Sequence, residues 1–190
     1  LYNFHFSFSI SMGILNMHYS PKGMAVWDTW FLSHAGRVHC MHLQRHRKGS
    51  DRPDGEEDWI GHAVSDDLIH WEELPLVLGP GQPGGGDDLQ PWTGCLIEHD
   101  GRFYLFYTMR SSRDKGMFQA IGLAFSDNLT NWRRYEGNPV IEPDPRWYVN
   151  KAHPLPTGKV DCRDLLVIRD PNRDGWLGYY AASIPPDSAN

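Results

Sequence analysis

Residues 60–71 read IGHAVSDDLIHW, and residues 121–132 read IGLAFSDNLTNW. Seven of the twelve positions are identical, and both segments lead into an apolar run and then into a stretch rich in proline and glycine. An internal repeat at a spacing of about 60 residues indicates that one structural unit is used more than once. The fold is therefore expected to consist of copies of this unit.

The match extends upstream of these two segments. Residues 27–37 align with residues 92–102, and each copy reads as a short apolar strand, a tight turn ending in Gly-Arg and a second strand. In the second copy the strand after the turn, residues 102–108, is RFYLFYT, a composition typical of β-strands. The pair Asp100-Gly101 is a strong signal for a two-residue hairpin turn.

A third copy begins near residue 163. Residues 163–168 read as its first strand, residues 170–175 as the turn, and residues 176–180 as the returning strand. Each full unit then has four antiparallel strands, which is the sheet of a β-propeller blade. The predicted fold class is all-β, and the sequence supplies about two and a half blades, over residues of about 27–80, 91–145 and an incomplete 160–190.

The blade count bears on the domain organisation. Propellers usually have four to eight blades, and a partial ring leaves strand edges and apolar faces uncovered. The sequence is therefore expected to be a fragment of a longer protein, in preference to a chain that closes the ring with a partner. Residues 1–17 are expected to be an extension outside the fold, and residues 18–190 to form the N-terminal part of a propeller domain.

Two aspartates fall at equivalent positions of the repeat. In a propeller the innermost strand of each blade begins near the central axis, and the repeat places Asp28, Thr93 and Asp164 at this point. Converging carboxylates are what glycoside hydrolysis requires, one as nucleophile or base and one as acid. The residues by themselves leave open a second interpretation, in which Asp28 and Asp164 only cap turns at the strand starts.

The composition excludes several classes of function. The net charge of −6 and the pI of about 5.9 argue against a nucleic-acid partner and against a basic membrane surface. The one basic cluster, residues 45–48, is expected to be a solvated loop. No run of 18 apolar residues predicts a membrane span. The N-terminal stretch is no convincing signal peptide, so the localisation stays open between the cytoplasm and secretion.

Three further patterns do not point to a site. The three cysteines, widely spaced, are expected to be buried thiols. Residues 79–84 fit G-x-G-x-x-G but hold two prolines and lead into no helix, so no phosphate loop is expected. Strand alternation places His39 and His42 on opposite faces, so neither a metal site nor a cofactor is predicted.

Several short motifs together resemble the β-fructosidases of glycoside hydrolase family 32. They keep the order and spacing of that family over residues from about 18 to 180. The match is most specific at Trp59–Trp71, which is similar to the family's W-G-H-A-V-S-x-D-L-x-H-W. The other motifs are His18–Gly23 followed by Asp28, Trp92–Cys95, and Cys162–Asp164.

This resemblance implies a five-bladed propeller that hydrolyses furanosides, β-fructofuranosides above all. It implies Asp28 as the nucleophile and Asp164 as the carboxylate that stabilises the transition state. The substrate-binding residues that it implies are Gln44, Trp92, Thr93, Gly94 and Arg163, with Arg163 orienting Asp164. The expected partner is an oligosaccharide or polysaccharide substrate, and the oligomeric state stays open.

The general acid and the specificity are not fixed by these motifs. In the resembled family the acid is a Glu on a later strand, which is expected beyond residue 190. The glutamates Glu98, Glu136 and Glu142 are expected to lie on the surface or in loops. Val26–Trp30 and Leu165 depart from the family's pattern. Two alternatives follow: an inverting arabinofuranosidase or xylosidase like those of family 43, and a sugar-binding propeller without catalysis.

Overall fold

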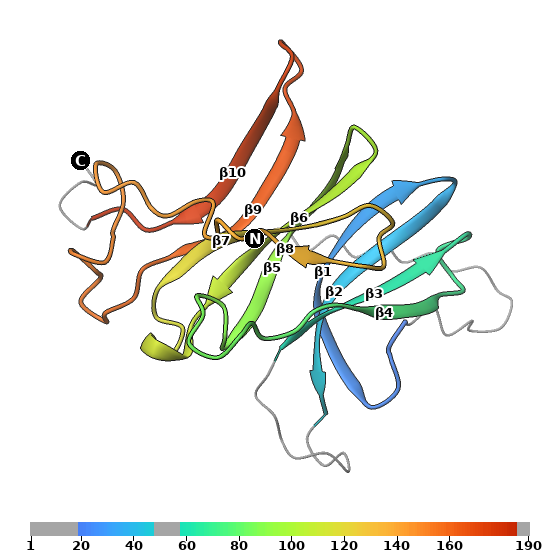
Figure 1. Ribbon diagram of the computed structural model, residues 1–190, viewed down its shortest axis with the longest axis horizontal. Coiled ribbons are helices and arrows are strands. Elements are labelled where there is room, and N and C mark those ends of the chain that lie inside the picture. Colours follow the sequence, from blue (N-terminus) through green and yellow to red (C-terminus); the bar gives the residue numbers. More distant parts are fainter. Residues whose placement is uncertain (1–18, 48–57, 186–190) are drawn as a thin grey trace, which may run out of the picture.

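The chain forms three antiparallel sheets in a computed structural model that describes residues 19–47 and 58–185 (Figure 1). Residues 1–17, expected to be an extension, lie outside the described residues. The first two sheets each have four strands in sequence order, so the predicted four-stranded unit is confirmed. The first sheet holds β1 (Met24–His34), β2 (Arg37–His46), β3 (Trp59–Ser65) and β4 (Glu72–Leu78). The second holds β5 (Gln90–His99), β6 (Arg102–Arg110), β7 (Gln119–Ser126) and β8 (Arg133–Arg134).

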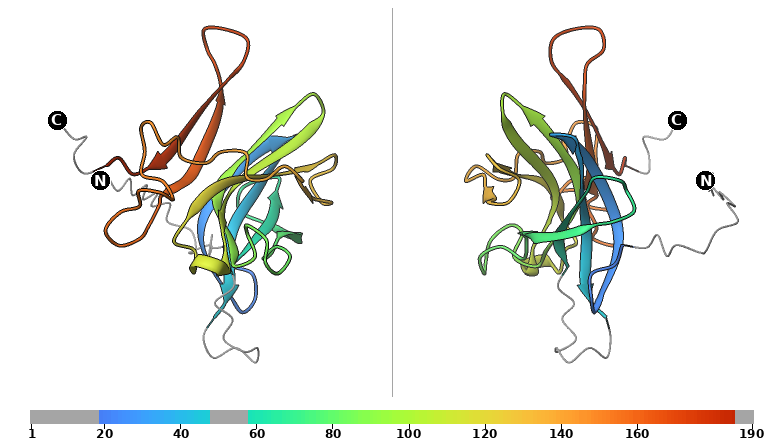
Figure 2. Two further views of the ribbon diagram at one scale, coloured as in Figure 1. Left: turned by 60° about the vertical axis from the view of Figure 1, so that its left-hand side comes forward. Right: turned by 90° about the vertical axis from the view of Figure 1, so that its right-hand side faces the viewer.

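The third sheet is a hairpin of β9 (Cys162–Arg169) and β10 (Trp176–Ala182). A short 3₁₀ helix, η1 (Ser112–Asp114), interrupts the connection between β6 and β7. The hairpins β1–β2, β5–β6 and β9–β10 stand side by side, and the views of Figure 2 show the sheets splayed about one region. This is the arrangement of successive propeller blades.

Tight turns close the first two hairpins. Asp100 and Gly101 have φ values of 51° and 71°, and Ala35 and Gly36 have 49° and 77°. Positive φ at both central residues is the property of the two-residue turn that matches the twist of paired strands. The hairpin predicted from Asp100-Gly101 is confirmed, and the first copy uses the same geometry.

The repeated Ser-Asp segment forms a turn that its own side chains hold. The Ser65 hydroxyl accepts the N–H of Leu68 at 2.8 Å, and the Asp67 carboxylate accepts the N–H of Ile69 at 2.9 Å. In the second copy the Asn128 side chain accepts the N–H of Asn131 at 2.9 Å. Short polar side chains thus replace the backbone partners that a turn lacks, which explains their recurrence without a catalytic role.

The apolar core lies between neighbouring sheets. Met41 and Leu43 on β2 are fully buried in one cluster with Leu105 and Tyr107 on β6. A second cluster joins the second and third sheets, and its buried members are Ile121, Cys162 and Leu165. Face-to-face packing of successive sheets is what fixes the ends of β1, β5 and β9 relative to one another.

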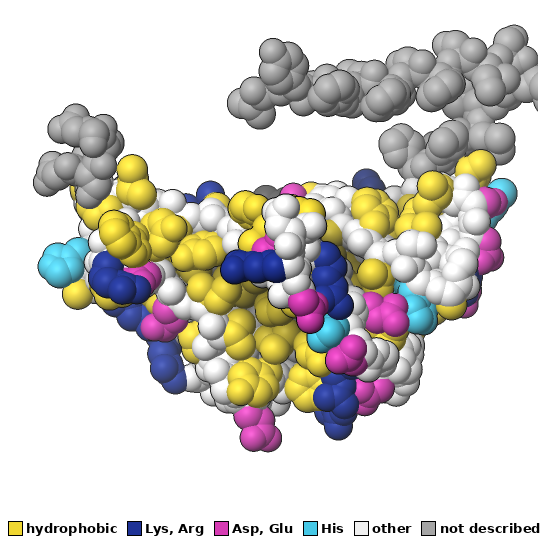
Figure 3. Space-filling view, turned by 90° about the horizontal axis from the view of Figure 1, so that it is seen from above, with side chains coloured by type: hydrophobic (Ala, Val, Ile, Leu, Met, Phe, Trp, Pro, Cys, Tyr) yellow, Lys and Arg dark blue, Asp and Glu magenta, His cyan; other side chains and the backbone are white. Residues whose placement is uncertain are grey.

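Part of the third sheet is uncovered. Leu166 and Tyr179 are more than half exposed. In a space-filling view from above, hydrophobic side chains gather across the middle of the face (Figure 3). Apolar surface of this kind is commonly covered by another element or partner.

Within the described part of the chain, no helix is long and apolar enough to cross a membrane.

Candidate active site

Three strands carry a β-bulge at the same point of the repeat. The pairing register shifts at Asp28 in β1, at Thr93 in β5 and at Asp164 in β9. A bulge inserts one unpaired residue and re-aims its side chain. Each first strand of a sheet therefore presents one polar residue at the position that the repeat predicted.

A series of hydrogen bonds connects these three residues across the sheets. The Thr93 hydroxyl donates to the Asp28 carboxylate. The Thr108 hydroxyl donates to the main-chain oxygen of Thr93 at 2.8 Å and accepts the N–H of Asp164 at 3.1 Å. Asp28 and Asp164 thus lie at one end of the three sheets, both exposed to solvent. The interpretation in which Asp28 and Asp164 only cap separate turns does not account for this connection.

Asp164 is held in an unusual backbone conformation. Its φ of 58° lies in the left-handed region, which costs a non-glycine residue about 1–2 kcal/mol. The N–H that Thr108 accepts belongs to this residue. Strain that the surroundings maintain is a recurrent property of functional positions.

The charges around Asp164 act on its carboxyl in opposite directions. Its side chain is about half exposed, and the partial burial is the largest influence: it raises the pKa, and the negative charge of Asp28 adds to the rise. Arg163 opposes it, with its Nε 3.3 Å from the Asp164 carboxylate. The Arg163 guanidinium also contacts Asp161 at 3.1 Å, which fixes it from the other side. The orienting role expected for Arg163 is compatible with this geometry.

Gly94 allows β5 to approach β6 closely. A Cβ atom at this position would overlap the carbonyl oxygen of Phe106. The pairing register advances from Trp92 opposite Thr108 to Gly94 opposite Tyr107, which is the bulge that exposes Thr93. The close approach of the two strands therefore requires a glycine at position 94.

Trp92 is held on its edge and on its face. Its Nε1–H donates to Asp58 at 2.8 Å, and the Arg110 guanidinium lies 3.7 Å from its ring centroid. Asp58 is 1% exposed and also accepts the Gln90 side chain. The ring is thus fixed beside the bulge that carries Thr93.

Arg45 belongs to this group, which corrects the interpretation of residues 45–48 as a solvated loop. Arg45 is the penultimate residue of β2, and His46 ends the strand. The Arg45 guanidinium contacts Asp58 at 2.6 Å and stacks 4.9 Å from the ring centroid of Trp27. Lys48 lies outside the described residues. The basic cluster was misjudged because its partner Asp58 lies thirteen residues away.

Gln44 lies near the end of β2, in surroundings different from those of Trp92. It pairs with Val26 and Trp59 and lines a separate hollow with Met24. Arg45, the next residue along the strand, points to the opposite face. The buried carboxamide oxygen of Gln44 has no hydrogen-bond partner within the part of the chain that the structure describes. Its predicted contact with substrate stays a prediction.

Three residues of this region were missed in the sequence, namely Asp58, Thr108 and Arg110. A signal existed for Thr108: the turn at Asp100-Gly101 pairs His99 with Arg102, and counting outward from that pair places Thr108 opposite Thr93. The bulge shifts the partner by one residue. Asp58 had no such signal, because its burial depends on contacts between two sheets.

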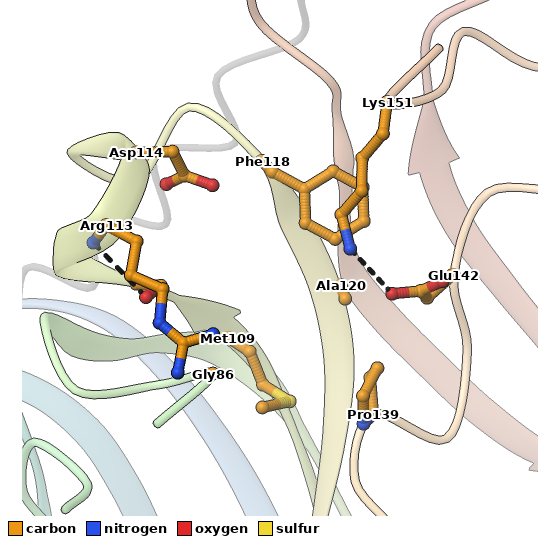
Figure 4. Close-up of a pocket in the computed structure, with 10 residues that line it drawn as sticks. Gly86, Met109, Arg113, Asp114, Phe118, Ala120, Pro139, Glu142 and Lys151 are labelled. Carbon is orange, nitrogen blue, oxygen red and sulfur yellow. Dashed lines mark hydrogen bonds and ion pairs between the residues drawn. The ribbon is translucent and has the colours of Figure 1, made fainter. Parts of the chain in front are cut away.

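A separate hollow of about 310 Å³ is lined in part by the η1 residues Arg113 and Asp114 (Figure 4). Lys151 reaches across the Phe118 ring, 3.8 Å from its centroid, to Glu142 at 3.1 Å. Met109 and Pro139 form an apolar part of the wall of this hollow. Lys151 and Glu142 neutralise each other, and the other carboxylate of the hollow, Asp114, accepts the N–H of Gly116 at 2.9 Å.

The histidines and cysteines have structural surroundings. His39 contacts His62 at 2.9 Å, and His42 lies on the opposite face of β2 against the ring of Tyr19. The three cysteines are buried and unpaired, as predicted; they are Cys40, Cys95 and Cys162. Over residues 19–47 and 58–185, no three His, Cys, Asp or Glu side chains are grouped so as to hold a metal ion.

The chain matches a known family model and a set of curated proteins. Residues 18–172 match the model described as the glycosyl hydrolases family 32 N-terminal domain. A levanase of Bacillus subtilis is 31% identical over 173 residues, covering 87% of this chain and 22% of the levanase. An acid β-fructofuranosidase of Capsicum annuum is 39% identical over 97 residues, covering 48% of this chain and 14% of that protein. The chain thus spans about a seventh to a fifth of the length of these relatives.

Solved structures share the fold. The exo-inulinase of Aspergillus awamori superposes with a TM-score of 0.64 at 23% identity, covering 86% of this chain and 34% of the inulinase. The fructofuranosidase of Schwanniomyces occidentalis, solved with fructose, gives 0.64 at 20% identity over 86% of this chain and 31% of that one. This likeness confirms the predicted fold, part of a five-bladed β-propeller.

Proposed function

The chain belongs to glycoside hydrolase family 32, and we propose that the protein containing it hydrolyses β-fructofuranosidic bonds in oligosaccharides or polysaccharides. The observation that carries the proposal is the hydrogen-bonded series from Asp28 through Thr93 and Thr108 to Asp164, which holds two carboxylates at one open end of the sheets. The family 43-like enzyme and the non-catalytic sugar binder are not favoured by the comparisons.

Asp28 is the proposed nucleophile. Its carboxylate attacks the anomeric carbon as the bond to the leaving oxygen breaks, and a general acid supplies that oxygen with its proton. Water then releases the sugar from the enzyme ester, which makes the reaction one of retention. The hydrogen bond from Thr93 orients Asp28 for attack. A glutamate beyond residue 190 is proposed as the acid.

Asp164 is proposed to stabilise the transition state. An ionised carboxylate fixed beside the sugar favours the positive charge that develops on the ring. Burial raises the pKa of Asp164, so the ionised form needs support, and Arg163 supplies a positive charge at 3.3 Å. The side chains of Trp92 and Thr93 and the backbone of Gly94 are proposed to border the same sugar.

The test uses the complete protein carrying Asp28→Asn. Fructose release from sucrose, inulin and levan is measured against the parent, with thermal melting as the check on folding. Asp174→Asn is the matched control, because Asp174 is fully exposed and contacts Arg169 in the turn between β9 and β10. We expect Asp28→Asn to lose activity by at least about a thousandfold with an unchanged melting temperature, and Asp174→Asn to keep the parental rate.

Fructose release by Asp28→Asn at the parental rate would refute the role of Asp28. Hydrolysis of an arabinofuranoside or a xyloside in place of all three fructosides would refute the proposed substrate class while leaving the aspartates open to test.

A further inference from the structure

A buried carboxylate, that of Asp58, connects the first sheet with the second. Asp58 directly precedes β3, and its side chain is 1% exposed. Its Oδ1 accepts two N–H groups of the Arg45 guanidinium, on β2, at 2.6 and 2.7 Å. Its Oδ2 accepts the Gln90 carboxamide at 2.5 Å and the Trp92 indole N–H at 2.8 Å, both on β5. Both oxygens of the carboxylate are therefore engaged.

The contribution of this carboxylate is mainly one of orientation. Apolar side chains of similar volume often join two elements as stably as a buried ion pair does. Hydrogen bonds add direction, because each donor has to point at its oxygen. The Arg110 guanidinium, 3.7 Å from the centroid of the Trp92 ring, sets the plane of that ring. The bond from the indole N–H to Asp58 then fixes how the ring is turned within its plane.

The contacts of this carboxylate lead to both sides of the proposed active site. The guanidinium of Arg45 lies 4.9 Å from the ring centroid of Trp27, and Trp27 directly precedes Asp28. Trp92 directly precedes Thr93, whose hydroxyl donates to Asp28. One buried group, well away from solvent, thus contacts the neighbours of both partners of that hydrogen bond.

We propose that Asp58 is a positioning residue for substrate binding, which holds the Trp92 ring in the orientation that borders the sugar. Asp58 does not touch the substrate in this proposal and acts only through the indole N–H. The contact of Trp92 with the sugar rests on the proposed function. The control of the ring by Asp58 does not, so the two can fail separately.

Asp58→Asn tests the proposal, because asparagine has the shape of aspartate but only one acceptor oxygen. That oxygen should face Arg45, since a hydrogen bond from a charged donor is the stronger one. The amino group then faces the donors on β5. Gln90 can turn its carboxamide and accept from it, whereas the Trp92 indole N–H can only donate. The substitution therefore removes the partner of Trp92 in particular.

The assay is steady-state hydrolysis of sucrose by the complete protein, with thermal melting as the check on folding. We expect Asp58→Asn to raise KM by about three- to tenfold and to change kcat by less than about twofold, since the lost interaction is one of binding. Glu98→Gln is the matched control. Glu98 also joins the first and second sheets, through His34 at 2.8 Å, but near the far ends of β1 and β5. Its KM should be that of the parent.

Trp92→Phe shows whether Asp58 acts through the indole. It keeps an aromatic ring and removes the N–H, so it should raise KM by itself. Adding Asp58→Asn to it should change KM by less than about twofold, whereas independent effects would multiply. In protein labelled with 5-fluorotryptophan, the fluorine resonance that is absent from Trp92→Phe belongs to Trp92. That resonance should move in Asp58→Asn and stay in place in Glu98→Gln.

A parental KM in Asp58→Asn would overturn the proposal, as would an unmoved Trp92 resonance or effects of the two substitutions that multiply. A fall in kcat at unchanged KM would also overturn it, because Asp58 would then act on the catalytic groups. Where Asp58→Asn does not fold, a parental KM in Trp92→Phe decides against it in the same way. A parent that cleaves neither sucrose, inulin nor levan would reject the proposed function alone, and the Trp92 resonance would still decide whether Asp58 fixes the ring.

Discussion

Thr108 joins the second and third sheets at the proposed active site, and replacing it with valine tests that arrangement most directly. The side chain is fully buried, and valine has nearly the same shape without the hydroxyl. The change removes the hydrogen bond to the main-chain oxygen of Thr93 and the one from the N–H of Asp164. We expect it to impair both catalysis and stability.

The size of each effect follows from what the hydroxyl holds. A buried group left without its partner costs about 1–3 kcal/mol, so the free energy of unfolding should fall by about that amount. Asp164 keeps its φ of 58° with the help of this bond, and its release allows a more favourable backbone conformation. A misplacement of about 1 Å at a catalytic group costs about 100-fold in rate. We expect kcat to fall by about 10- to 100-fold.

The assay is steady-state fructose release by the complete protein, with kcat and KM determined separately and unfolding followed in urea. Thr130→Val is the matched control, because the half-buried Thr130 also uses its hydroxyl for one main-chain hydrogen bond, to Asn128 at 3.0 Å. That variant should change neither kcat nor the urea midpoint appreciably. Thr108→Ser, which retains the hydroxyl, should recover most of the lost kcat.

A purely structural Thr108 would give a different pattern. The urea midpoint would fall while kcat stayed at the parental value, and Thr108→Ser would offer no catalytic recovery. That result would refute the reasoning that Thr108 positions Asp164.

Three other predictions concern single positions. Gly94→Ala should destabilise the fold by more than about 3 kcal/mol, since its Cβ would overlap a backbone oxygen, whereas Gly101→Ala, with open space around it, should cost about 1 kcal/mol; urea unfolding compares them. Asp164→Asn should melt above the parent at pH 7, because burial raises the carboxyl pKa and the charged form is disfavoured on folding; the difference should shrink as the pH falls and the parent's carboxyl protonates. Burial lowers the pKa of His62 to about 4, so the unfolded chain binds its proton first as the pH falls below about 6.5; stability should decline from there to pH 4, and less steeply in His62→Gln.

The features that the sequence predicted well are local ones. Asp100-Gly101 and the Ser-Asp turns are determined by residues within a few positions, and the strand pattern of the repeat follows from alternation. Asp28, Thr93 and Asp164 could be aligned because the repeat carries their positions from one blade to the next. The bulges that expose them were not visible, since a bulge depends on the partner strand.

The features that it missed depend on contacts between sheets. Asp58 is acidic and precedes a strand, which reads as a surface residue until Arg45, Gln90 and Trp92 are brought around it. Gln44 raises a related question: the family resemblance implies a substrate contact, and alternation along β2 places this residue on the face opposite Arg45. Faces of a strand can be counted from sequence, but which face meets the site requires the packing of neighbouring blades.

The position of the site at the junction of three sheets has a mechanical consequence. Asp28, Thr93 and Asp164 come from three different sheets, and the packing of those sheets together with the hydrogen bonds between them keeps these residues together. A change in the buried cluster of Ile121, Cys162 and Leu165 would move β9, and Asp164 with it, relative to β5. Core substitutions between the second and third sheets should therefore lower kcat even though they touch no substrate, and a substitution at the exposed Leu76 of the outer strand β4 should not.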